Sequence, residues 1–104
     1  MVINRRTFKI KPGLMDAAIQ AVDDFAKERG IPASGSNPRM LTAEYGPFDV
    51  LILEVEHENL DACNKYWAEI FDHPAAEALF TKWWAVVEGG GTNEVWNVIT
   101  PEMM

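Results

Sequence analysis

His73 is one of two histidines in the chain, and its chemistry can be interpreted in two ways. An imidazole titrates near neutral pH, so His73 could act as a general base or bind a metal or haem iron. Pro74 follows it and interrupts a helical segment, so His73 could equally be a helix cap or hinge residue. Glu69 and Glu77 have the spacing of a shared helical face with His73, but the proline breaks that geometry. A solvated acidic face is favoured over a metal site, and we expect no bound metal.

Asn4 and Arg6 lie on one parity of an N-terminal strand, among apolar neighbours. If that face is buried, Arg6 is a cation that needs an anionic partner. Glu54 or Glu94 could supply a carboxylate across a sheet, or Arg6 could hold an anionic or enolate oxygen of a ligand. Both alternatives stay open at this point, and Glu54 is counted with the candidate ligand-binding residues.

Four tryptophans in a chain of 104 residues are more than one thin domain can hide. Trp83 and Trp84 are adjacent, so on a helix they point about 100° apart and cannot both enter the same core. One of them is therefore expected at an interface or a pocket mouth. Trp67 and Trp84 are the predicted ligand-binding tryptophans, which could stack on a flat aromatic compound.

Other reactive side chains are predicted to be structural. Cys63 has no adjacent base and lies among helix-forming residues, which indicates an inert packing thiol. His57 lies between Glu56 and Glu58 and is interpreted as a strand-end residue in a charged patch. The run Gly89-Gly90-Gly91 follows a helix instead of preceding one, so it is no phosphate-binding loop.

Composition excludes several classes of partner. Sixteen acidic against nine basic residues give a net charge of −7, which argues against nucleic-acid binding. The longest apolar run is Val50–Leu53, far short of the roughly 20 residues that span a bilayer. No signal peptide is apparent after Met1, and the chain has one cysteine, so we expect a soluble cytoplasmic protein.

Hydrophobic periodicity places these residues on six elements of a single domain covering residues 1–104. Period-two and period-3.6 patterns predict a strand over 2–10, a helix over 14–29, strands over 39–45 and 48–57, a helix split by Pro74 into 60–72 and 75–87, and a strand over 92–100. The glycine run is expected to end the second helical piece. This order is that of an α+β ferredoxin-like βαββαβ domain, a four-stranded antiparallel sheet with the helices on one face.

The other face of such a sheet needs a cover. Several strands are apolar on both parities, as in Val50–Leu53 and Val95–Ile99. Large exposed apolar surfaces mark an interface or a ligand groove. The economical solution is a homodimer in which two sheets pack face to face.

Two short motifs resemble a known group of proteins. Arg6-Thr7-Phe8-Lys9-Ile10-Lys11-Pro12-Gly13 resembles the opening strand and turn of the NIPSNAP-like branch of the dimeric α/β-barrel superfamily, to which antibiotic-biosynthesis-monooxygenase-like proteins also belong. Gly91-Thr92-Asn93-Glu94-Val95-Trp96 resembles the last strand of that branch. The resemblance implies a dimeric α/β barrel. The fold also hosts cofactor-free monooxygenases, haem-degrading oxygenases and lactone isomerases, and Asn4, Trp67 and His73 match the residue types of the haem-degrading branch.

The resulting hypothesis is a small-molecule pocket between the sheet and the helices. It would serve a cofactor-independent monooxygenase or isomerase acting on an aromatic or enolisable substrate, with His73 as proton acceptor and Asn4 and Arg6 as the other catalytic residues. The alternative is a non-catalytic binding or oligomerisation module. The two differ in one observable: an enzyme should keep a concave pocket containing His73 or Arg6, whereas a structural module should fill that space with aromatic side chains.

Overall fold

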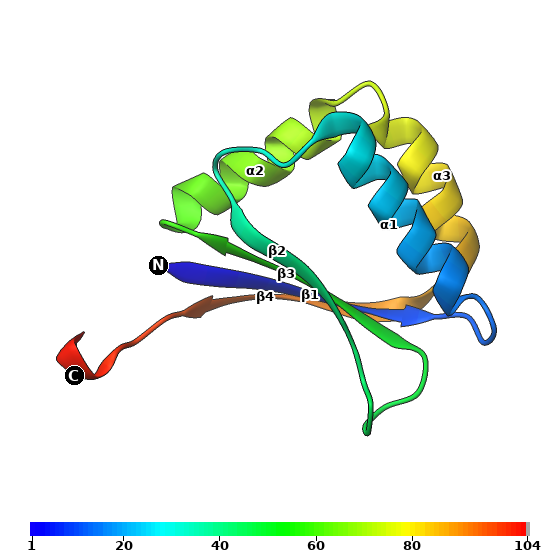
Figure 1. Ribbon diagram of the computed structural model, residues 1–104, viewed down its shortest axis with the longest axis horizontal. Helices are drawn as coiled ribbons and strands as arrows, with labels where there is room; N and C mark the ends of the chain where they lie inside the picture. Colours follow the sequence, from blue (N-terminus) through cyan, green and yellow to red (C-terminus); the bar gives the residue numbers. More distant parts are fainter. Residues whose placement is uncertain (104) are drawn as a thin grey trace.

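The chain forms two layers, a four-stranded antiparallel sheet and three α-helices that cover one of its faces (Figure 1). The computed structural model describes residues 1–103. Along the chain the elements are β1 (Val2–Ile10), α1 (Met15–Arg29), β2 (Ser36–Thr42), β3 (Val50–His57), α2 (Leu60–Asp72), α3 (Ala76–Val86), β4 (Val87–Asn97) and the 3-10 helix η1 (Pro101–Met103). The strands lie in the order β2-β3-β1-β4, and each neighbouring pair is antiparallel. The predicted ferredoxin-like α+β fold is confirmed.

Several of the helix ends have a local cause. The Asn59 side chain accepts a hydrogen bond from the Ala62 N–H at 2.9 Å and so caps the start of α2. Helix α1 ends at Gly30, whose φ of +73° suits glycine and whose N–H donates to the Ala26 carbonyl at 2.9 Å. As predicted, the segment around Pro74 separates α2 from α3. None of the described helices is long and apolar enough to span a membrane.

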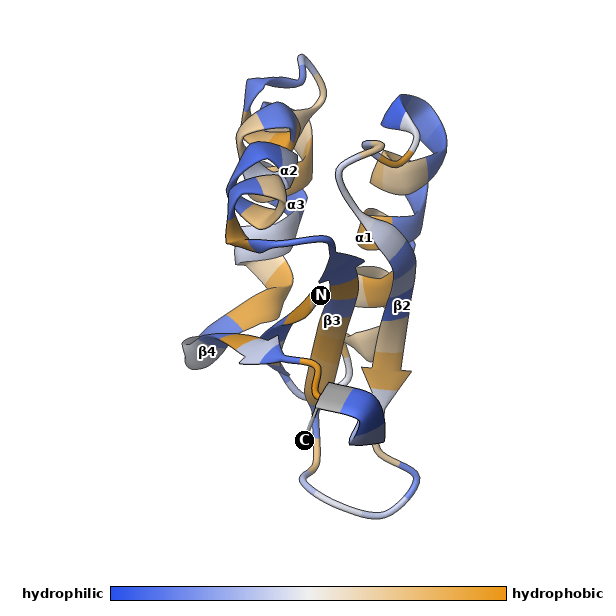
Figure 2. Ribbon diagram, turned by 90° about the vertical axis from the view of Figure 1, so that its left-hand side faces the viewer, coloured by the Kyte–Doolittle hydropathy of each residue, from blue (hydrophilic) through white to orange (hydrophobic). Residues whose placement is uncertain are grey.

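The core lies between the sheet and the helices and consists of two apolar clusters. One cluster contains Ile10, Ala18, Leu51, Trp83 and Val86. The other contains Phe25, Val55, Tyr66, Ile70 and Ala76. The middle strand β3 is hydrophobic over most of its length and hydrophilic at its end (Figure 2). The Phe8 ring meets the Trp83 ring edge to face at 4.9 Å, so the parity of β1 that carries Asn4, Arg6 and Phe8 faces the helices.

The predicted bounds of two strands are wrong. Strand β2 covers 36–42 where 39–45 was expected, and β4 begins at Val87, directly after α3, where 92–100 was expected. The glycine run therefore lies inside β4 and does not end the helix. Pairing with β1 explains this difference. Residues 7–9 of β1 lie opposite residues 88–92 of β4, so β4 has extra residues here that form a β-bulge, and the three glycines lie in this bulge. Gly90 has a φ of +93°, which favours glycine.

Gly91 in this bulge is required by a close backbone contact. A Cβ at Gly91 would lie 2.6 Å from the Thr7 carbonyl oxygen, so Gly91→Ala should lower the free energy of unfolding by about 1–3 kcal/mol. At Gly89 a Cβ would meet nothing within 4 Å, so Gly89→Ala should change the free energy of unfolding by less than about 0.5 kcal/mol. Urea unfolding followed by tryptophan fluorescence measures both variants. Equal effects at the two positions would show that the contact with Thr7 is not what demands glycine.

Candidate functional site

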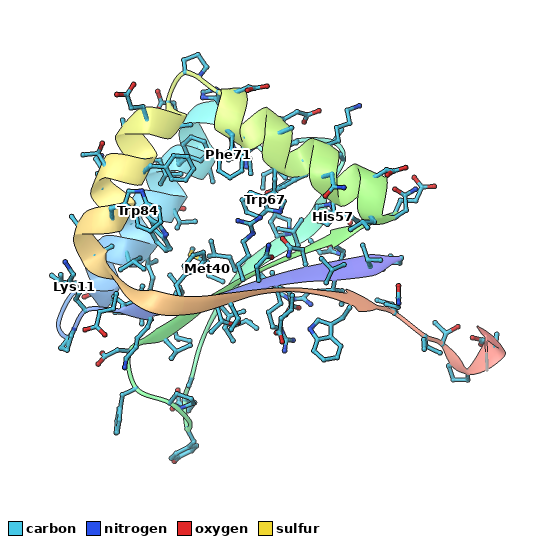
Figure 3. The ribbon with its side chains drawn as sticks, turned by 180° about the vertical axis from the view of Figure 1, so that it is seen from behind. Lys11, Met40, His57, Trp67, Phe71 and Trp84 are labelled. Atoms are coloured by element: carbon cyan, nitrogen blue, oxygen red, sulfur yellow. The ribbon has the colours of Figure 1, made fainter. Side chains whose placement is uncertain are left out.

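A cavity of about 510 Å³ lies between the helices and the sheet. Trp67 and Phe71 reach into it from α2, Trp84 from α3 and Met40 from β2 (Figure 3). The other apolar side chains of its wall are Phe8, Val22, Phe25, Leu53, Ile70, Leu79, Phe80 and Trp83. Both the volume and the mostly apolar wall are typical of small-molecule sites, which measure about 300–1,000 Å³.

Asn4, Arg6 and Trp67 form one hydrogen-bonded group at this cavity. Asn4 is only 2% exposed, and its Oδ1 accepts hydrogen bonds from Trp67 Nε1 at 2.7 Å and from Arg6 Nε at 3.4 Å. Its Nδ2 donates to Asn93 Oδ1 at 2.7 Å and to the Glu94 carbonyl at 2.9 Å. The guanidinium of Arg6 stacks on the Trp67 ring at 3.7 Å. Asn4 therefore fixes both side chains, each of which lines the cavity.

Arg6 is held on the cavity wall without a carboxylate partner. Among residues 1–103, no Asp or Glu side chain lies within ion-pair distance of its guanidinium. Burial removes hydration from the charged form and lowers the pKa of Arg6, although it remains a cation at neutral pH. The side chain is therefore a fixed positive charge that faces an apolar cavity.

Of the two alternatives for Arg6, pairing with Glu54 or Glu94 is wrong. Glu54 lies opposite Arg5 in the β1–β3 register, so its carboxylate lies on the face of the sheet away from the helices. There it accepts from Arg5 at 2.8 Å and also pairs with Arg39. Because side chains alternate along a strand, Arg5 and not Arg6 reaches this carboxylate. Although Glu54 belongs to the cavity lining, its charged group does not point into the cavity.

Arg39 and Arg5 hold the buried carboxyl group of Glu54 in its charged form. Burial alone would raise the pKa of Glu54, but the hydrogen bonds and charges of Arg39 and Arg5 outweigh burial and lower this pKa. A depressed carboxyl pKa contributes stability above the unfolded-state pKa, and this contribution is lost as the pH falls through the folded-state value. The carboxylate therefore stabilises the sheet at neutral pH.

His73 lies at the junction of α2 and α3 and not in the cavity lining. Its Nδ1 accepts a hydrogen bond from the Ala75 N–H at 3.0 Å, and its ring packs edge to face against Phe25 at 5.8 Å. The structure thus brings Asn4 and Arg6 together and leaves His73 apart from them, in the position of a cap. The Asn4, Trp67 and His73 set does not form a haem site here, because Trp67 lines the cavity whereas His73 lies outside its lining and accepts a backbone hydrogen bond at Nδ1.

Within the part of the chain that the structure describes, no three His, Cys, Asp or Glu side chains are grouped to hold an ion. The second histidine, His57, is buried, and its Nδ1 lies 2.8 Å from the Ser34 carbonyl oxygen. Burial raises the pKa of the Cys63 thiol, which leaves it protonated and unreactive at neutral pH.

The adjacent tryptophans separate as their spacing predicts. Trp83 is buried in the core, whereas Trp84 is 67% exposed and lies on the cavity wall. The cavity therefore retains an indole that is free to contact a ligand.

Arg29 and Tyr66 also line the cavity, and neither was among the site residues predicted from the sequence. Arg29 lies in the last turn of α1, where a basic residue is common for electrostatic reasons alone. Its position therefore did not indicate that it also lines the cavity. The spacing in the sequence does place Arg29 on the apolar face of α1, because it follows Val22 by seven residues and Phe25 by four. That face lines the cavity.

Comparison with known proteins identifies similar folds. No protein-family model matches the chain, and a search of curated proteins finds no match. Among solved structures, a NIPSNAP family protein of unknown function from Agrobacterium tumefaciens has a TM-score of 0.75 at 20% identity, covering 91% of this chain and 85% of its own. An uncharacterized NIPSNAP domain protein from Burkholderia xenovorans has a TM-score of 0.78 at 11% identity, covering 97% of each chain.

An antibiotic biosynthesis monooxygenase has a TM-score of 0.72 at 12% identity, covering 96% of this chain and 100% of its own. These are the two kinds of protein that the sequence motifs resemble. At such identities the likeness concerns the fold alone. The chain therefore shares the ferredoxin-like fold of NIPSNAP proteins and of antibiotic biosynthesis monooxygenases.

Proposed function

We propose that this protein binds a small aromatic or enolisable compound in the cavity and stabilises its oxyanion at Arg6. The observation that carries the proposal is the fixed guanidinium of Arg6, which stacks on Trp67 and has no carboxylate partner among the described residues. A mostly apolar cavity with few polar groups binds the body of a ligand by burial and orients it by charge. Trp67 and Trp84 supply aromatic surfaces for a flat ring.

The proposed reaction is cofactor-independent monooxygenation or isomerisation. A cation beside an enol or phenol favours the deprotonated form, which is electron-rich at carbon. The proton that leaves the substrate passes to water, and return of a proton at a different carbon is an isomerisation. Where the electron-rich carbon carries two hydrogens in the substrate, dioxygen adds there to give a hydroperoxide. Loss of water from the hydroperoxide leaves a carbonyl group, so one oxygen atom stays in the product, the other leaves as water, and the substrate itself is the reductant. In both reactions Arg6 holds the oxyanion, and Asn4 and Trp67 keep Arg6 in place.

The alternative of a structural module predicted a space filled with aromatic side chains. The open cavity that contains Arg6 favours ligand binding over that alternative. A binding protein without catalysis would use the same residues, and only turnover separates it from an enzyme.

The test uses 2-naphthol, a flat aromatic compound whose deprotonated form has a distinct absorption spectrum. Bound to the protein, its hydroxyl pKa should fall by about 1–3 from the value in water, because Arg6 stabilises the naphtholate. Arg6→Gln should abolish this shift. The matched control is Arg5→Gln, which removes the same charge from the neighbouring residue on the opposite face of the sheet and should keep the shift. A spectrum that titrates identically in the Arg6 variant would contradict the proposed role.

We also propose that a second copy of the chain covers the sheet face opposite the helices, called the outer face below. No described helix lies on this face (Figure 1). It carries Trp96 and Leu41 at its surface, and the loop between β2 and β3 extends beyond it with Tyr45 and Phe48 almost fully exposed. Aromatic side chains of this kind are enriched in protein interfaces.

A further inference from the structure

Arg29 is a second guanidinium on the cavity wall whose charge is not neutralised. It stacks against Phe25 at 5.2 Å and Tyr66 at 5.7 Å, and its Nη2 donates to the Tyr66 hydroxyl at 3.4 Å. Its Nε is buried and makes no hydrogen bond with the described residues. No carboxylate of the described residues lies within ion-pair distance of it. Arg29 thus repeats the arrangement of Arg6.

The aromatic rings that hold the two guanidinium groups are neighbours on the cavity wall. Arg6 stacks on Trp67, Arg29 stacks on Tyr66, and the two rings meet edge to face at 5.2 Å. The rest of the wall, which includes Phe80 and Trp84, is mostly apolar, and its charged members Asp23, Arg39 and Glu54 all take part in ion pairs. The cavity therefore has a cationic region on one side and an aromatic region on the other.

This arrangement is unusual for a chain with a net charge of −7. A buried or half-buried cation is costly unless an anion accompanies it. Two acidic residues line the cavity, but Glu54 of the sheet points to the outer face, and Asp23 of α1 is paired with Lys27 at 2.9 Å. Two guanidiniums without counter-ions, held in place by aromatic rings, form a region of the cavity suited to negative charge.

We infer that the ligand carries a carboxylate in addition to the oxygen held at Arg6, and that Arg29 binds this carboxylate. The ligand class is therefore an aromatic or enolisable carboxylic acid, with its apolar body against Phe80 and Trp84. A planar guanidinium matches a carboxylate with two parallel hydrogen bonds, which makes Arg29 a selectivity residue. This inference rests on the proposed binding function, because it adds a second anchor to the same ligand.

The test compares 6-hydroxy-2-naphthoate with its neutral amide, 6-hydroxy-2-naphthamide, by isothermal titration calorimetry. The acid should bind about tenfold more tightly or better, which is the effect of one good charge-assisted pair. In Arg29→Gln the preference for the acid should fall to near one, while the amide keeps its affinity. Retained amide binding also shows that the variant is folded. The control is Lys65→Gln, which removes an exposed charge next to Tyr66 and should keep the preference.

The outcomes separate this inference from the proposed function. If the acid and the amide bind equally to the unmodified protein, or if Arg29→Gln keeps the preference, the carboxylate assignment is wrong, although binding in the cavity stands. If neither compound nor 2-naphthol binds, the proposed function fails together with this inference. A preference that disappears in Arg29→Gln alone supports the assignment.

Discussion

Replacing Asn4 with alanine should lower the free energy of unfolding by about 2–3 kcal/mol and also disable the candidate site. The side chain is buried, and its amide satisfies Trp67, Asn93 and the Glu94 carbonyl at once. Alanine would leave the Trp67 N–H and the Glu94 carbonyl without these partners, which accounts for the expected loss. Arg6 would lose its contact with Oδ1, so the pKa shift of bound 2-naphthol should shrink. Urea unfolding and the naphthol titration measure the two effects.

Two further variants make this prediction specific. Asn97→Ala removes an exposed asparagine of β4 and should change stability by less than about 0.5 kcal/mol. Asn4→Asp keeps oxygen acceptors for Trp67 and Arg6 but places a carboxylate beside Arg6. That counter-ion should remove most of the naphthol pKa shift even where the protein remains folded. If Asn4→Ala were as stable as the unmodified protein, the network around Asn4 would not hold the site together.

The fold could be predicted from the sequence because its elements carry strong local patterns. The period change after Ile10, the cap at Asn59 and the proline at position 74 all act within a few residues. The bounds of β4 could not be predicted in this way. These bounds depend on a bulge in the pairing with β1, which is distant in the sequence. Without knowledge of that pairing, a run of glycines after a helix indicates a helix end.

The candidate site was predictable only in part, for a similar reason. Asn4, Arg6 and Trp67 were identified by residue type, and the structure brings them together. The sequence does not show which parity of a strand faces the helices, so it leaves open whether Glu54 pairs with Arg6, and the structure pairs Glu54 with Arg5 instead. His73 was selected for its chemistry, but its neighbouring proline fixes it at a helix junction. Arg29 was passed over because a cation at a helix end already has an adequate explanation.

The outer face has features that suit contact with an identical copy. Trp96 is 56% exposed and lies opposite Ile3 in the sheet, while Leu41 lies opposite Ile52, so two apolar areas flank the centre. Between them lies the ion cluster of Arg5 and Arg39 with Glu54 and Glu56. Two positive and two negative charges cancel within this cluster, so Glu94, which lies opposite Arg5, is the charge that two approaching copies have to accommodate at the centre of the contact.

Trp96→Ala should therefore weaken the proposed homodimer by about 2 kcal/mol or more, which is roughly a thirtyfold rise in its dissociation constant. Light scattering over a dilution series into the low micromolar range measures the solution mass of both proteins. Trp84→Ala is the matched control, since it removes an exposed indole from the cavity side and should leave association unchanged. If the unmodified protein is a monomer, the proposed dimer is wrong. If Trp96→Ala forms the dimer as strongly as the unmodified protein, the interface does not include Trp96. Because the cavity lies on the opposite side of the sheet from Trp96, loss of the dimer should leave binding of 2-naphthol intact.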